Sequence, residues 1–298
     1  MSLPIAFVAV VLIWSTTPLA IKWSALGAGF GFAVFARMVI GVVLCALLLA
    51  VLRIRMPWHR SARLTYGIGG ISIFGAMSLT YWASQYISSG LIAVLFGLSP
   101  LITGLGAAHW LKEKALTWNK VAGMLLGLIG LATIFRHNLA IGPHAFAGIT
   151  ALLCAVTVQS LGLVWIKRIA DHSSPVAINL GSLVFALPWF ALTWLLTDGQ
   201  VPTAVPERAL IAIAYLGLFG SVIGFVLYFY MIKHLEAGRV ALITLITPVL
   251  ALLLGHQLNA EAVPFNVWFG TVGILAGLSL HQWGDLALAR LSPGKYRA

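Results

Sequence analysis

Two prolines, Pro100 and Pro248, lie near the middle of two long apolar segments. A proline inside a helix removes the hydrogen bond to the carbonyl four residues earlier and kinks the helix. The carbonyls released here belong to Phe96 and Thr244. In an apolar setting each carbonyl needs a new polar partner or a water-filled cavity. The paired interruptions therefore predict a central binding cavity, with a simple packing kink as the alternative.

Aromatic and hydroxyl side chains near these prolines suit a small amphipathic solute. Gln159 is a polar side chain deep in another apolar segment, so it should find a partner in the interior of the molecule. Packing and hydrogen bonding between helices is the alternative role for each of these residues. The residues predicted to line the cavity are Trp14, Thr17, Met77, Tyr81, Phe96, Ser99, Pro100, Gln159, Leu163, Tyr228, Thr244, Thr247 and Pro248.

Arg37 is the only Lys or Arg well inside an apolar segment. Its guanidinium has the shape to bind a carboxylate through two hydrogen bonds. It lies about two turns from the start of its helix, so the alternatives are that it reaches the outer surface or donates to backbone carbonyls. We favour the structural role.

Several kinds of chemistry are disfavoured by what the sequence lacks. All seven Asp and Glu residues fall in loops or at helix ends, so proton coupling through a buried carboxylate is not expected. If the protein moves a solute across a membrane, the mechanisms left are facilitated diffusion of that solute and proton coupling by a histidine relay through His109 or His256. The sequence has no GxxxxGK[ST], HExxH or GxSxG motif, and its histidines show no ligand spacing. We therefore expect no enzyme activity, no metal and no cofactor; the alternative is a membrane-embedded enzyme acting on lipid.

The composition indicates an all-α polytopic membrane protein. The chain has 298 residues, of which 61% are hydrophobic and 8% are charged, whereas a soluble domain has about 25% charged residues. The net charge of +11 does not indicate a nucleic-acid partner, because the basic residues flank apolar segments. Membrane lipids at the inner surface are the expected anionic partner.

Ten segments are long and apolar enough to be membrane-spanning helices. They cover roughly residues 3–21, 31–52, 64–84, 89–111, 118–135, 145–165, 175–197, 209–231, 236–256 and 264–283. If the N-terminus is inside, the outer segments hold only Lys22, Arg136 and Arg208, and nearly all other Lys and Arg residues lie in cytoplasmic segments. This bias predicts a multi-pass protein of the bacterial inner membrane with both termini in the cytoplasm.

An internal repeat divides the chain into residues 1–140 and 141–298, each with five predicted helices. Because five is odd, the second half enters the membrane from the opposite side, so the halves are inverted repeats, an arrangement typical of secondary transporters. GxxxG pairs in residues 118–135 and 264–283 also predict close helix packing, either within one chain or in a weak homodimer. The matching residues, at a constant offset of 148, are Gly90 with Gly238, Ala93 with Ala241, Pro100 with Pro248 and Glu113 with Glu261.

The joint pattern resembles the EamA-type exporters of the drug/metabolite transporter superfamily over nearly the whole chain, most closely the bacterial YddG-type amino-acid exporters. The residues that carry the resemblance are Trp14, Lys22, Arg37, the two prolines, and Glu113 and Glu261. The second half departs from the pattern with Gln159 opposite Trp14, and with Asn179 and Ser182 where an Arg is sought. The resemblance implies an alternating-access carrier that exports amino acids, including aromatic or other apolar ones, or similar small metabolites. Nucleosides and sugar phosphates are the alternative substrates.

Overall fold

The computed structural model describes residues 3–111, 118–139, 143–197, 199–227, 231 and 237–291, and the regular structure of these residues is helical. Side chains of residues 135–139, 143, 237–242, 244, 245, 282 and 285–291 lie outside the described part. The helices are α1 (Leu3–Ser24), α2 (Phe30–Val51), α3 (Arg60–Ala83), α4 (Ser89–Phe96), α5 (Ser99–Trp110), α6 (Trp118–Leu139), α7 (Pro143–Ile169), α8 (Pro175–Thr197), α9 (Glu207–Tyr215), the π-helix η1 (Leu216–Ile223), α11 (Ala237–Asn259) and α12 (Phe265–Leu291).

Several described segments are long and apolar enough to cross a membrane, which makes the chain a multi-pass membrane protein. The six such segments are Leu3–Ser24, Phe30–Val51, Ser89–Trp110, His144–Ile169, Pro175–Thr197 and Glu207–Leu227, with shorter apolar helices at Trp118–Ile134 and Phe265–His281. Helices α3 and α11 cover the two remaining predicted spans and are 24 and 23 residues long.

The segment predicted as one span at residues 89–111 is divided in two. Helix α4 ends at Phe96 and α5 begins at Ser99, because Pro100 has no N–H to donate to the Phe96 carbonyl. Tight backbone bonds close the gap: Gly97 N donates to Val94 O at 3.1 Å, and Leu98 N donates to Leu95 O at 3.0 Å. Pro248, by contrast, lies inside the continuous helix α11. Pro100 therefore interrupts its segment and Pro248 does not, so the predicted pair of interruptions is found at one of its two positions.

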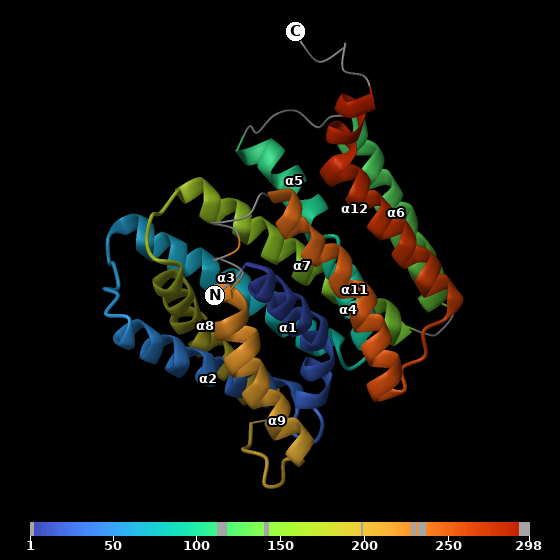
Figure 1. The fold of residues 1–298 in the computed structure, drawn as a ribbon. Helices are drawn as coiled ribbons and strands as arrows, with labels where there is room; N and C mark the ends of the chain where they lie inside the picture. The colour runs from blue at the N-terminus through green and yellow to red at the C-terminus, as the bar shows by residue number, and fades with distance from the viewer. Residues whose placement is uncertain are drawn as a thin grey trace.

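Helices α6 and α12 pack against one another along their length through facing glycines (Figure 1). A Cβ placed on Gly277 would lie 2.5 Å from the Gly123 carbonyl oxygen, and one on Gly130 would lie 2.6 Å from that of Gly270. No side chain fits between these backbones. The close packing predicted from the GxxxG pairs is confirmed, and it takes place within the chain.

Helices from the beginning and the end of the chain are interleaved throughout the bundle (Figure 1). Helix α3 packs on α7 and α8, α2 packs on α8 and η1, and α1 packs on α9 and α11. Helices α4 and α11 cross in antiparallel directions. Gly90 at the start of α4 contacts Leu252, and Gly97 just after its end faces the earlier residue Pro248. The bundle is thus held together by contacts between the two halves of the sequence.

Candidate functional site

The two proline-containing segments meet inside the bundle. A Cβ on Gly97, in the gap between α4 and α5, would lie 3.7 Å from Pro248 Cγ on α11. Thr247 beside this proline is 9% exposed, and Phe96 packs on a buried cluster that includes Leu98 and Leu252. The structure therefore places Phe96, Thr247 and Pro248 around one crossing point. The side chain of Thr244 lies outside the described residues.

The start of α5 is tied to α7 in the second half. Ser160 Oγ donates to the backbone carbonyl of Ser99 at 3.3 Å, next to Pro100 in the first turn of α5. Gln159, one residue earlier on α7, has a buried Oε1 without a hydrogen-bond donor in the described part of the chain. Leu163, one turn further along, is 48% exposed. Gln159 thus presents an unused acceptor beside the break in the fourth predicted span.

Helix α1 supplies the predicted site residues Trp14 and Thr17. The Trp14 ring meets the edge of Phe225 with the ring centroids 6.5 Å apart. Thr17 Oγ1 donates to its own helix at Ile13 O at 2.7 Å. Trp14 is therefore placed against the end of the η1 segment, while the Thr17 hydroxyl satisfies a local backbone bond. Tyr228, the predicted aromatic residue that follows this segment, lies outside the described residues.

Helix α3 carries Met77 and Tyr81, which lie on one face and pack in the cluster formed with α2, α8 and α9. Tyr81 is completely buried, and its hydroxyl has no hydrogen-bond partner among the described residues. Met77 Sδ lies 3.9 Å from a terminal nitrogen of Arg37. The sequence did not anticipate this contact, because nothing in the spacing of α2 and α3 fixes how the two helices are rotated.

Arg37 does not reach the surface, because it is only 4% exposed. Its side chain extends from α2 and contacts α3 and η1. Its Nε donates to Ser221 Oγ at 3.1 Å. The carbonyl of Ser221 accepts a bond from Asn179 Nδ2 at 3.1 Å. The π-helix that holds Ser221 gave no signal in the sequence, although such turns are frequent at functional sites.

A second polar group joins the C-terminal ends of α1 and α11 to the N-terminal end of α4 around Glu261. Oε2 of this carboxylate accepts bonds from Ser89 N and Ser89 Oγ, both at 2.8 Å, and so caps the first turn of α4. Oε1 accepts from Asn259 Nδ2 at 2.9 Å and lies 3.4 Å from Lys22 Nζ. Lys22 also donates to Ile87 O at 3.0 Å. The motif residues Lys22 and Glu261 thus form an ion pair between the two halves; Glu113, the repeat counterpart of Glu261, lies outside the described residues.

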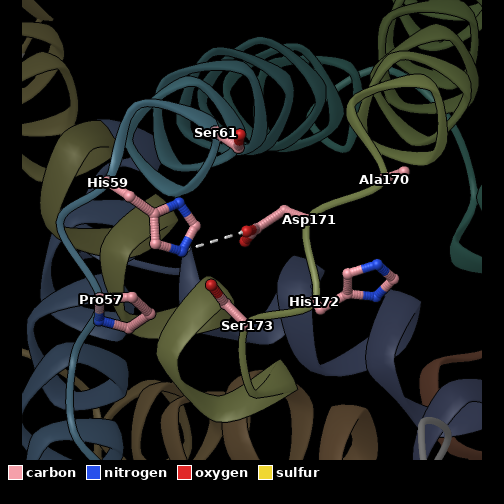
Figure 2. A pocket seen from close by; sticks show the side chains of 7 residues that line it. All are labelled: Pro57, His59, Ser61, Ala170, Asp171, His172 and Ser173. Atoms are coloured by element: carbon pink, nitrogen blue, oxygen red, sulfur yellow. Dashed lines mark ion pairs between the residues drawn. The ribbon is translucent and has the colours of Figure 1, made fainter.

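A hollow of about 410 Å³ lies at the opposite end, between the α2–α3 and α7–α8 loops (Figure 2). The side chain of Asp171 is 2% exposed and points toward His59, with 3.6 Å between Oδ1 and Nε2. His59 Nδ1 accepts from Ala62 N at 3.2 Å and caps α3. We therefore assign the neutral tautomer with the proton on Nε2. The loops that line this hollow come from both halves of the chain, and none of the predicted site residues is among its lining residues.

The helical bundle, with its long apolar segments, defines a multi-pass membrane protein. Comparison with known proteins gives the family. The sequence pattern of the EamA-like transporter family matches residues 1–136 and, a second time, residues 146–281. The chain belongs to this family, within the drug/metabolite transporter superfamily, and it is a transporter rather than an enzyme.

Curated relatives are similar over most of the chain. Protein PagO of Salmonella typhimurium is 27% identical over 94% of this chain and 92% of its own. A "Probable terminal-alkyne amino-acid exporter" of Streptantibioticus cattleyicolor is 26% identical over 92% of this chain and 91% of its own. A "Probable amino-acid metabolite efflux pump" of Salmonella typhimurium is 26% identical over 74% and 77%.

A solved crystal structure has the same fold. It superposes on 97% of this chain and 98% of its own with a TM-score of 0.65 and 22% sequence identity.

Proposed function

We propose that the protein exports amino acids, including aromatic or other apolar ones, or similar small amphipathic metabolites. The observation that carries the proposal is the crossing of α4–α5 with α11 at Gly97 and Pro248. Solute sites of transporters lie where the two repeats meet and are typically built from discontinuous helices, and here the interrupted α4–α5 segment crosses its repeat counterpart α11. The relatives named as an amino-acid metabolite efflux pump and an amino-acid exporter favour this substrate class.

The transport mechanism that we propose is alternating access between residues 1–140 and 141–298, each a five-helix repeat, with ten spans in all and the repeats inverted. The double match of the family pattern supports two repeats. The packing supports a two-fold relation between the halves, because exchanging them converts one set of helix contacts into another: α3 with α7 corresponds to α9 with α1, and α3 with α8 corresponds to η1 with α2. Helices α4 and α11 are antiparallel, as an axis in the membrane plane requires.

The placement in the cell also belongs to this proposal: the bacterial inner membrane, with both termini in the cytoplasm and the basic loops facing anionic lipid. The glycines of α6 and α12 are occupied by contacts within the chain, so we propose a monomer. Reporter fusions to each terminus test the orientation. A cytoplasmic reporter should be active and a periplasmic one inactive at both ends.

The substrate class is tested by efflux from proteoliposomes loaded in turn with amino acids, nucleosides and sugar phosphates. We expect apolar amino acids to leave at saturable rates above those of protein-free vesicles. Gln159→Leu serves as a site variant, and Gln257→Leu, an exposed position on α11, serves as its matched control. Efflux of nucleosides or sugar phosphates alone would replace the amino-acid proposal with the corresponding carrier.

A further inference from the structure

The guanidinium of Arg37 is buried in the bundle, and no carboxylate of the described residues is paired with it. Arg37 is 4% exposed. Among the described residues, the carboxylate of Glu261 faces Lys22 and that of Asp171 faces the neutral His59, and neither carboxylate faces this group. Removing a charge from water is costly unless it is compensated, and an uncompensated charge inside a membrane protein is by default a functional group.

Arg37 also has more hydrogen-bond donors than the described residues use. A guanidinium carries five N–H groups. One is taken up by Ser221 Oγ at 3.1 Å from Nε, and another faces the weak thioether acceptor Met77 Sδ at 3.9 Å from a terminal nitrogen. The bond from Nε fixes the plane of the group and leaves donors on both terminal nitrogens. Paired donors of this kind match the two oxygens of a carboxylate.

The surroundings hold the guanidinium in place from the second half of the chain. Ser221 belongs to the π-helix η1. Asn179 Nδ2, on α8, donates to the backbone carbonyl of Ser221 at 3.1 Å. Gly220 lets the guanidinium pack closely against the backbone of η1, because a Cβ there would lie only 3.1 Å from its second terminal nitrogen. Residues of η1 and α8, both in the second half of the chain, therefore position the guanidinium of Arg37.

A second unused polar group lies close by on α3. Tyr81 is completely buried, its hydroxyl has no partner among the described residues, and it lies one turn from Met77 on the same helix face. We infer that Arg37 binds the carboxylate of the transported solute, with the Tyr81 hydroxyl within one helical turn of that site. This inference deepens the proposed function and rests on it. It replaces the structural role for Arg37 that the sequence favoured.

The test compares three probes that differ only in the carboxylate: L-phenylalanine, L-phenylalaninamide and 2-phenylethylamine. Their transport at low concentration is measured in proteoliposomes containing wild type, Arg37→Met or Arg37→Lys. Arg208→Met is the matched control, because this arginine lies over the Trp23 ring at the outer end, 3.8 Å from its centroid. Melting temperature and gel-filtration profile are recorded for each protein.

Wild type should carry phenylalanine about 10- to 100-fold faster than either analogue, the range expected for losing hydrogen bonds to a charged group. Arg37→Met should abolish this preference by slowing phenylalanine alone. Arg37→Lys should retain part of it, and Arg208→Met all of it.

Two results would overturn the inference while leaving a transporter in place. One is wild-type transport of phenylalaninamide at the rate of phenylalanine, which needs no variant to fold. The other is a parallel loss of all three probes in folded Arg37→Met, which marks a purely structural arginine. Absence of amino-acid transport by wild type would instead contradict the proposed function and this inference with it.

Discussion

Replacing Glu261 by Gln should destabilise the end of the bundle where α1, α4 and α11 meet. The carboxylate receives two bonds from Ser89 on one oxygen, and a bond from Asn259 and the charge of Lys22 on the other. An amide presents one oxygen and one NH₂, so in either orientation its NH₂ faces donors. Hydrogen bonds to charged groups contribute about 1.5–3 kcal/mol each and neutral ones about 1 kcal/mol. With Glu261 8% exposed, the net loss should be about 2–4 kcal/mol.

Thermal unfolding of the purified protein in detergent measures this loss. At about 2 °C or more per kcal/mol for a chain of this size, the melting midpoint of Glu261→Gln should fall by roughly 5–10 °C. Glu207→Gln is the matched control, because Glu207 is exposed in the first turn of α9. This variant should shift the melting midpoint little. Lys22→Met should cost less on the Glu261→Gln background than alone. Equal midpoints for Glu261→Gln and Glu207→Gln would refute the account of this network.

Three further predictions concern the site, the helix interface and coupling. Gln159→Leu should change the order of preference among amino acids in proteoliposome uptake while its level in the membrane stays near wild type, because the Oε1 acceptor is buried and unused; identical kinetics across the panel would remove Gln159 from the site. Gly277→Ala should lower the free energy of unfolding by about 1–3 kcal/mol through overpacking, since its Cβ would lie 2.5 Å from the Gly123 carbonyl oxygen. Gly67→Ala is the control, because its Cβ would lie 3.8 Å from its nearest neighbour, and it should melt like wild type. Similar melting midpoints for the two variants would argue against the α6–α12 packing. Transport should continue when the proton gradient is collapsed with an ionophore, because the described carboxylates lie in loops or in a first helical turn; uphill accumulation driven by a pH step would show proton coupling.

Much of the helical layout follows from the sequence, because long apolar segments have few alternatives in a membrane. The break at residues 97–98 was expected from Pro100, yet the same residue type at Pro248 leaves α11 continuous. The difference lies in tertiary packing, which sequence spacing does not report. The GxxxG pairs predicted close contact, but only the structure shows that α6 and α12 are partners within one chain.

The candidate site was predicted by residue type more than by position. Phe96, Thr247 and Pro248 are brought together with the break in the fourth predicted span. Ser99 lies at the adjoining contact of α5 with α7, where it is bonded by Ser160, the residue after Gln159. Arg37 was assigned a structural role because it matches a position of the EamA-type family that was taken to be structural, and its distance from the helix start allowed it to reach the surface. Helix rotation instead turns it toward η1. The repeat predicted neither the π-helix nor the Asn179–Ser221 bond, because both belong to the second half alone.

Counterflow in proteoliposomes tests the central claim most directly. Vesicles containing the purified protein are loaded with unlabelled phenylalanine and diluted into a trace of labelled phenylalanine, without any ion gradient. The account predicts a transient, saturable accumulation of label above its equilibrium level, with the label recovered chemically unchanged. Label that rises only to equilibrium, or at the same rate with and without internal phenylalanine, would contradict an alternating-access amino-acid carrier.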